Sequence, residues 1–247
     1  MKYKTIKYKK KGLIAHILLD IPEHGRSIYE CMCKELAEVC DIIDQDDSIN
    51  VVVIEISGET FSVGARNKTN EMMCEAVDAV SRMGKIVVAV IIGDAIGEGL
   101  ELVLACDIRI ASDRSHFALP HVAHGSIPSS GGTQRLPRLI GQAKALELIL
   151  TANTIDAEEA LRIGLIHKVV SFQDIAKETD IVVKKIAEKA PIALRFCKEA
   201  VYKGIDLTFE QGMRLEADLY FLIQTTSDRM EGIKAFLEKR SPKFKGK

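Results

Sequence analysis

The amino-terminal part of the chain alternates apolar and polar positions with the period of two that is typical of β-strands. Lysines alternate with Tyr, Thr and Ile over residues 2–8, and a second short run of β type covers residues 13–19. The two runs predict a β-hairpin with its turn at residues 9–12. We expect the lysines to lie on a solvated edge strand, where their charge discourages the addition of further strands. A patch that attracts anions is the alternative.

The middle of the chain repeats the order strand, helix, strand. A helix is expected to begin at Ser27, because Ser27 and Glu30 have the spacing of a capping box and an apolar stripe follows them. Buried strands are expected at residues 51–56 and 86–92, with a helix over residues 70–83 between them. A glycine-rich turn, a short helix and a further strand follow. This rhythm favours right-handed β-α-β crossovers, and therefore an α/β fold.

From Gly131 onward the pattern is mostly helical. Asp156 and Glu159 have the spacing of an N-cap residue and the third residue of its helix. The last helices are expected over residues 208–223 and 228–239.

A boundary between two parts of the chain is predicted near Pro191, a residue type that suits the first turn of a helix. Residues 1–190 would form an α/β core, and residues 191–247 a helical region. The 247 residues, 47% of them apolar, are enough for one large domain or for a domain with a small appendage. The apolar face of the helical region lacks enough core partners of its own, so we expect it to pack between subunits.

Composition narrows the class of protein. The net charge of −1 gives no reason to expect nucleic acid, and the absence of Trp with only 5% aromatic residues argues against stacked bases. The longest apolar run, residues 86–92, is too short to cross a membrane. The six cysteines form no C-x-x-C pair, which indicates buried thiols in a reducing compartment. We therefore expect a soluble cytoplasmic protein without a nucleic-acid or membrane partner.

Gly93, Gly97 and Gly99 follow a buried strand and open a helix. Such a turn can present backbone N–H groups to an anion. The spacing is not G-x-G-x-x-G, and no G-x-x-x-x-G-K-[ST] occurs, so neither a dinucleotide site nor a nucleoside-triphosphate site is favoured. From spacing alone, an oxyanion-binding turn and a plain tight turn both stay open.

Several segments together resemble the crotonase (enoyl-CoA hydratase/isomerase) superfamily. The longest runs from KIVVAVIIGDAIGEGLELVLACD to SIPSSGGTQRLPRLIG. TFSVGARNKTNEM is similar to the family's first oxyanion loop, TANTIDAEEALRIGLIHKVV to the segment after the core, and EGIKAFLEKRSPKFKGK to the tail. The resemblance covers almost the whole chain in one order. It implies an α/β spiral of β-β-α units with a C-terminal helical trimerisation region, assembled as a homotrimer or homohexamer.

In that family, two backbone N–H groups hold the thioester carbonyl of an acyl-CoA. By position these belong to Val63 and Glu98, where the family usually has a small residue and a glycine. Every residue except proline supplies such a donor. The Glu98 side chain could be a surface-facing cap of its helix, or it could reshape the acyl pocket.

Two side chains match the positions of the family's paired catalytic glutamates. Glu101, in GEGLELVLACD, keeps the carboxylate, whereas His121, in ALPHVAHGSIP, replaces the second glutamate. Imidazole can accept or donate a proton near neutral pH, and in its neutral form it does not repel the anion of its partner. The resemblance therefore implies an acid–base pair of altered charge. SSGGTQR is taken as a helix-entry turn, because no nucleophile elbow surrounds its serines.

Further residues are matched to substrate binding. By resemblance, contacts to the acyl-CoA thioester are expected from Val63, Gly64, Ala65, Arg66, Gly97 and Gly99, with Phe236 and Lys239 reaching the CoA of a neighbouring subunit. Arg66 stands where the family usually has aspartate, so a phosphate contact and a surface position both stay open. No cofactor is expected apart from the coenzyme A of the substrate. No metal is expected either, since Pro120 makes helical ligand geometry improbable for His116, His121 and His124.

The leading hypothesis is hydration of a 2-enoyl-CoA to a 3-hydroxyacyl-CoA. Loss of the second glutamate keeps open double-bond isomerisation, C–C hydrolysis and decarboxylation on the same enolate-stabilising platform. The substitutions around one site also keep open a degenerate crotonase that binds acyl-CoA without catalysis.

Overall fold

Two β-sheets form the centre of the molecule in a computed structural model that describes residues 3–20, 26–57, 60–61 and 69–247. Within these residues, the larger sheet has the strand order β1-β2-β3-β5-β7-β10. Its strands are β1 (Ile6–Lys11), β2 (Ile14–Asp20), β3 (Val51–Ser57), β5 (Ile86–Ile91), β7 (Ile108–Ser112) and β10 (Lys168–Val170). β1 pairs antiparallel with β2, and all later pairs are parallel. The parallel pairs confirm the crossovers expected from the sequence.

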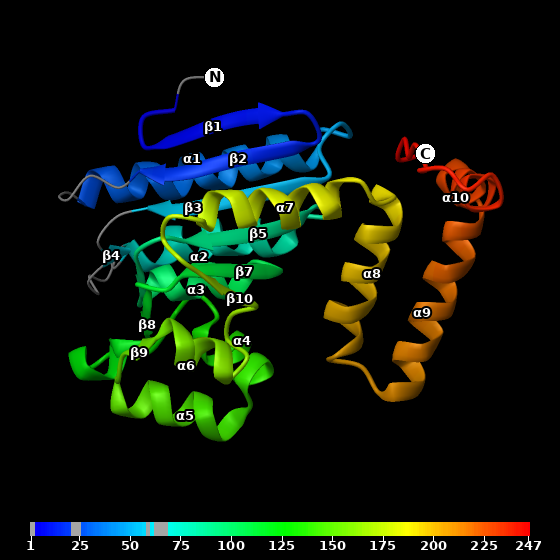
Figure 1. The fold of residues 1–247 in the computed structure, drawn as a ribbon. Coiled ribbons are helices and arrows are strands. Elements are labelled where there is room, and N and C mark those ends of the chain that lie inside the picture. The colour runs from blue at the N-terminus through cyan, green and yellow to red at the C-terminus, as the bar shows by residue number, and fades with distance from the viewer. Residues whose placement is uncertain (1–2, 21–25, 58–59, 62–68) are drawn as a thin grey trace.

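Alternate residues of the large sheet pack into two separate cores. Helices α1 (Arg26–Asp44) and α2 (Thr69–Arg82) lie behind the sheet, and α7 (Ile175–Ala187) lies in front of it (Figure 1). Ile54 belongs to the cluster that includes α1 and α2, whereas its neighbour Val53 belongs to the cluster that includes α7. A strand buried on both faces requires apolar side chains at consecutive positions, which explains the continuous apolar runs in the sequence.

The smaller sheet supports the helices that carry the candidate site. Its strands, in spatial order, are β4 (Thr60–Phe61), β6 (Asp94–Ile96), β8 (His116–Ala118) and β9 (Ile155–Asp156). Around it lie α3 (Glu98–Ala105), the 3₁₀ helix η1 (Pro120–His124), α4 (Gly132–Ile140), α5 (Gln142–Thr151) and α6 (Ala157–Arg162). The Asp156 side chain accepts a hydrogen bond of 2.8 Å from Glu159 N, which confirms the expected N-cap.

Two predicted boundaries are wrong by a few residues. The hairpin exists, but its pairing continues to Lys11 and Ile14, so the turn consists of Gly12 and Leu13 and not of residues 9–12. The three lysines of that segment, Lys9 to Lys11, belong to the strand, and all three are exposed. Helix α1 begins at Arg26, one residue before Ser27, so Ser27 lies inside the first turn.

The C-terminal helices stand beside the core (Figure 1). They are α8 (Pro191–Gly204), α9 (Phe209–Gln224) and α10 (Ser227–Leu237), and Pro191 is in the first turn of α8 as expected. Lys198 on α8 ties this region to the core, because its Nζ lies 2.8 Å from Asp107 Oδ2 and donates to the Lys85 carbonyl. The division into domains at residue 190 stays a prediction.

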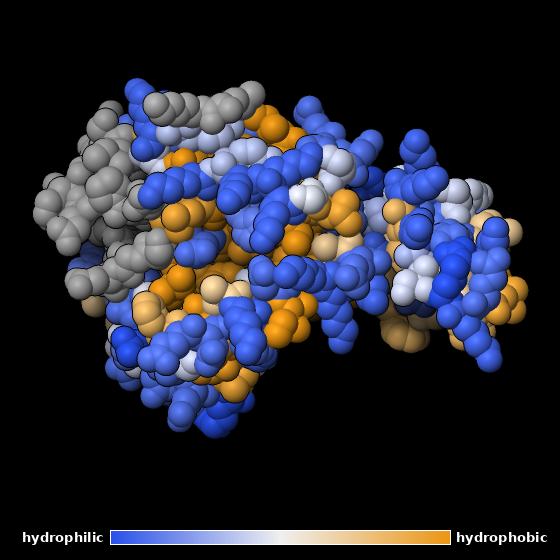
Figure 2. Space-filling view, turned by 45° about the horizontal axis from the view of Figure 1, so that its top comes forward, coloured by the Kyte–Doolittle hydropathy of each residue, from blue (hydrophilic) through white to orange (hydrophobic). Residues whose placement is uncertain are grey.

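Large apolar side chains remain exposed on the three C-terminal helices. Phe209 is 86% exposed, Val201 70%, Phe221 69% and Phe236 83%. Figure 2 shows apolar patches on this part of the molecule, among charged side chains. No helix in the described part of the chain is long and apolar enough to span a membrane.

Candidate functional site

Glu101 lies on a helix that runs through the interior. Gly97 precedes α3 with a φ of 62°, a left-handed value that glycine adopts without strain and that turns the chain from β6 into the helix. Every residue of α3 is buried, and the Glu101 side chain has 0% exposure. A carboxylate removed from water in this way is costly unless hydrogen-bond donors meet it.

The entrance to α4 supplies those donors. Glu101 Oε1 accepts hydrogen bonds from Ser130 N at 2.7 Å and from Gly132 N at 2.8 Å. The amino end of a helix carries a partial positive charge, so this position favours an anion. A Cβ at Gly132 would lie 3.1 Å from Glu101 Oε1 and 2.9 Å from Pro128 Cβ, so the turn has room for glycine only. The resemblance marked this segment as a helix-entry turn and did not reveal that it holds Glu101.

His121 faces the other carboxylate oxygen. The imidazole belongs to η1 and is 5% exposed, and its Nε2 lies 3.7 Å from Glu101 Oε2. This distance is too long for a hydrogen bond. Burial lowers the pKa of His121 below its usual value, and the Glu101 carboxylate only partly opposes this effect. The imidazole of His121 is therefore mostly neutral at pH 7, which differs from the unperturbed titration considered from the sequence.

Unpartnered buried polar atoms gather at this place. Within the described residues, six buried side-chain N or O atoms have no hydrogen-bond partner, and four of them are Glu101 Oε2, His121 Nδ1, His121 Nε2 and Ser130 Oγ. Such atoms are rare in folded proteins, and each requires an explanation such as a catalytic role or a polar ligand. The arrangement can hold a small polar group between a proton acceptor and a group that exchanges protons.

The Glu98 side chain is buried and not surface-facing. It is 4% exposed, because the whole of α3 is enclosed, so the interpretation as a solvated cap is wrong. Its backbone N–H lies in the first turn of the helix, where N–H groups have no partner within the helix. Gly97 and Gly99 flank it at the same turn.

The remaining expected site residues fall into two groups. Val63, Gly64, Ala65 and Arg66 lie outside the residues that the structure describes. Phe236 is in α10 and Lys239 follows it, and α10 lies on the opposite side of the molecule from α3 (Figure 1). In a single chain these two side chains do not join Glu101 and His121.

The three histidines considered as metal ligands have separate surroundings. His116 Nδ1 lies 2.9 Å from Asp94 Oδ1 on the neighbouring strand, whereas His121 faces Glu101. No group of three or more His, Cys, Asp or Glu side chains within the described ranges is placed to hold a metal ion.

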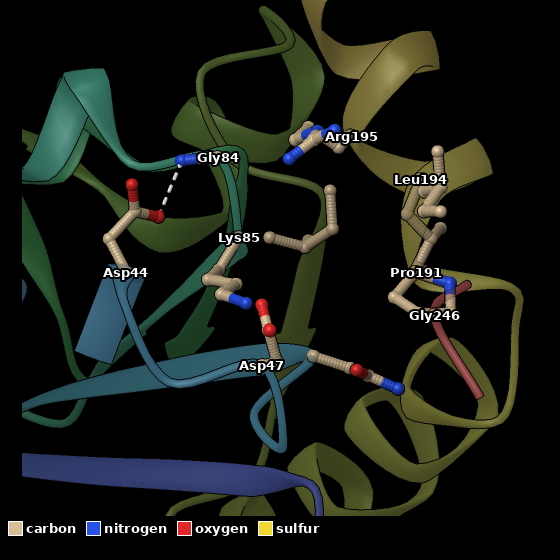
Figure 3. A pocket seen from close by; sticks show the side chains of 11 residues that line it. Asp44, Asp47, Gly84, Lys85, Pro191, Leu194, Arg195 and Gly246 are labelled. Atoms are coloured by element: carbon tan, nitrogen blue, oxygen red, sulfur yellow. Dashed lines mark hydrogen bonds between the residues drawn. The ribbon is translucent and has the colours of Figure 1, made fainter. Parts of the chain in front are cut away.

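A separate pocket lies at the joint between the core and the C-terminal helices (Figure 3). Lys85, which directly precedes β5, and Asp44 line it from the core, and Pro191 and Arg195 line it from α8. Asp44 Oδ1 accepts a 2.8 Å hydrogen bond from the Gly84 N–H. The charges of the lining largely balance, and neither Glu101 nor His121 is part of it. The pocket therefore belongs to the joint and not to the candidate site.

Comparisons with known proteins agree with this geometry. The chain is 35% identical to a probable enoyl-CoA hydratase of Mycobacterium leprae, over 99% of each chain. It is 36% identical to an (E)-benzylidenesuccinyl-CoA hydratase of Thauera aromatica, over 94% of this chain and 96% of the relative. The crystal structure of an enoyl-CoA hydratase from Bacillus anthracis superimposes with a TM-score of 0.91 at 33% identity, and covers 99% of this chain and 100% of its own. The family model for enoyl-CoA hydratase/isomerase matches residues 9–247. The chain therefore belongs to the enoyl-CoA hydratase/isomerase family, and its fold is the crotonase fold.

Proposed function

We propose that this protein hydrates a 2-enoyl-CoA thioester to a 3-hydroxyacyl-CoA. The observation that carries the proposal is the buried pair of Glu101 Oε2 and His121 Nε2, 3.7 Å apart and both without a hydrogen-bond partner in the described chain. The names of the relatives as enoyl-CoA hydratases support the same reaction class.

The backbone around α3 would stabilise the enolate. In this proposal the thioester oxygen accepts hydrogen bonds from the N–H groups of Glu98 and Val63, and the amino end of α3 faces the growing negative charge. Losing one such donor costs about 2.7–4 kcal/mol in comparable sites. Gly64, Ala65 and Arg66, with Gly97 and Gly99, would contact the acyl-CoA. The coenzyme A moiety belongs to the substrate, and the proposal includes no other cofactor.

Glu101 and His121 would move the two protons of the reaction. The Glu101 carboxylate removes a proton from water while the water oxygen forms a bond to C3, and the electrons of the double bond move toward the thioester oxygen. His121, in its imidazolium form, then delivers a proton to C2. Transfer of the proton from Glu101 back to His121 restores the pair, so that one water is consumed in each turnover.

Isomerisation of the double bond is the second candidate. The lowered pKa of His121 favours it, because a neutral imidazole can remove a proton from one carbon of the acyl chain and return it to another. This reaction uses the same N–H groups for the enolate and requires no water.

A steady-state assay with crotonyl-CoA tests the proposed function. Hydration is expected to remove the absorbance of the conjugated thioester and to yield an equal amount of 3-hydroxybutyryl-CoA, measured by chromatography. A panel of cyclic, branched and carboxylated enoyl-CoA substrates extends the assay. A product with a displaced double bond would favour the isomerase, and binding without turnover of any substrate would favour a non-catalytic protein.

We also propose that the chain assembles as a trimer or hexamer through α8, α9 and α10. The large apolar side chains that these helices expose support the proposal, because large exposed apolar patches in soluble proteins mark interaction surfaces. Phe236 and Lys239 would then reach the CoA of a neighbouring subunit. Sedimentation equilibrium at micromolar concentration should give three or six chain masses, and a monomer would contradict the proposal.

A further inference from the structure

We propose that Arg135 is a positioning residue for Glu101, acting through the turn of residues 130–132. The inference rests on the proposed function, since it concerns how the chain holds a carboxylate that exchanges protons with water. Arg135 would fix the two N–H groups that bind Oε1, and so keep Oε2 directed at His121.

The guanidinium of Arg135 returns along its own helix to that turn. Arg135 Nη1 donates a 2.7 Å hydrogen bond to the Ser130 carbonyl, while the Ser130 N–H donates to Glu101 Oε1 at 2.7 Å. Ser130 is therefore hydrogen-bonded to Glu101 through its N–H and to Arg135 through its carbonyl. A planar guanidinium has a fixed donor geometry, which suits it to lock a peptide in place.

The two glycines of the turn make room for these two side chains. Gly131 has a φ of 97°, and a Cβ there would lie 2.0 Å from Arg135 Nη1. A Cβ at Gly132 would lie 3.1 Å from Glu101 Oε1. Arg135 and Glu101 thus pack against adjacent residues of one tight turn, and a shift of either is transmitted to the other.

A second contact connects the turn to α2. Arg135 Nη2 lies 3.6 Å from Asp78 Oδ1, with side-chain exposures of 26% and 49%. An exposed ion pair at this distance contributes little to stability. The hydrogen bond to the Ser130 carbonyl is therefore the main contact by which Arg135 constrains the turn. The charged and titratable side chains around Glu101 and His121 are Cys74 and Asp78 on α2, Glu98 on α3, His121 and His124 on η1, and Arg135 on α4. Among these groups, Arg135 is the permanent cation.

Removal of the guanidinium should affect chemistry more than substrate binding. The turn would lose its constraint, and Glu101 Oε2 would sample positions away from His121. A misplacement of about 1 Å in a catalytic group can cost about 10²-fold in rate. Glu98, whose backbone N–H is proposed to bind the thioester, lies on α3, and no residue of this turn is among the proposed thioester ligands, so KM should change little.

The test compares Arg135→Met, Arg135→Lys and Arg138→Met. Arg138 is the matched control, because it lies on the same helix and its Nη1 donates to the Gln134 carbonyl at 2.8 Å, away from Glu101. We expect Arg135→Met to lower kcat by about 10²-fold with KM unchanged. Arg135→Lys should lower kcat less, because lysine keeps the positive charge but lacks the planar guanidinium. Arg138→Met should have the same kcat and KM as the parent.

The backbone amide signals of Ser130 and Gly132 give a readout that does not depend on turnover. Hydrogen bonds to a carboxylate are strong and move amide protons downfield, so both signals should move upfield in Arg135→Met and stay in place in Arg138→Met. The proposal would be overturned if the amide signals and kcat stayed unchanged in both Arg135 variants. It would also be overturned if Arg138→Met lowered kcat as much as Arg135→Met does. If the parent hydrates no enoyl-CoA, the proposed function fails, and the amide signals still decide the role of Arg135.

Discussion

Glu101→Gln is expected to lower kcat by about 10²–10⁴-fold, the usual range for a lost acid–base group. The amide keeps the shape of the carboxylate, and its oxygen can still accept the hydrogen bonds from Ser130 N and Gly132 N. The amide nitrogen that would then face His121 cannot accept a proton from water. The loss should therefore appear in kcat, measured at saturating enoyl-CoA, while KM stays similar.

The controls for this variant separate chemistry from folding. Glu101 is fully buried, so a change in melting temperature must be measured alongside the rate. Glu147→Gln provides a matched substitution of an exposed helical carboxylate, whose partner is Lys144 at 3.0 Å. It should leave kcat unchanged. Full activity of folded Glu101→Gln would remove this residue from the mechanism and direct attention to Glu98 and Arg66.

The order of strands and helices was predictable because each strand is buried on one or both faces. Strand β5 is almost entirely buried and has a continuous apolar run, whereas β1 is mostly exposed and contains lysines. Each pattern is visible in the sequence. The register of the hairpin was not predictable in the same way. Lysines suit both an edge strand and a turn, and the pairing of Lys11 with Ile14 depends on tertiary contacts.

The candidate site was predictable only in part. Glu101 and His121 could be placed by resemblance, because each lies in a distinctive segment, and the structure brings them to 3.7 Å. The burial of Glu98 could not be read from its neighbours, since it follows from the enclosure of the whole of α3. The contact of Ser130 and Gly132 with Glu101 joins residues about thirty positions apart, which local periodicity does not reveal.

His121→Ala should also lower kcat by about 10²–10⁴-fold, because it removes the proposed proton donor to C2.

The pH dependence of the parent identifies the active form of His121. Burial lowers the pKa of His121, so the imidazolium fraction decreases as pH rises through that lowered value and is small at pH 7. If imidazolium is the donor, kcat/KM of the parent falls by on the order of tenfold for each pH unit above that pKa. His121→Ala should lose this slope. A parent profile that stays flat from the acid range to alkaline pH would contradict the imidazolium as donor.

His121→Glu is expected to move the loss of activity to higher pH and so to raise hydration at alkaline pH. The new carboxyl would be buried and would lie beside the Glu101 carboxylate, and both effects raise the pKa of a carboxylic acid. It would therefore keep a proton near neutral pH, where His121 has already lost its own. Crotonyl-CoA hydration by this variant, measured from pH 5 to pH 9 beside the parent, should exceed the parent increasingly on the alkaline side, by on the order of tenfold per pH unit until the new carboxyl ionises. His121→Gln, which is neutral at every pH in this range, controls for the loss of imidazole, and its rate of hydration should stay low throughout.

Hydration that appears in His121→Glu but is absent from the parent at every pH would show that the paired carboxyl groups perform hydration. It would also show that His121 has adapted this protein to isomerisation or another reaction of the enolate.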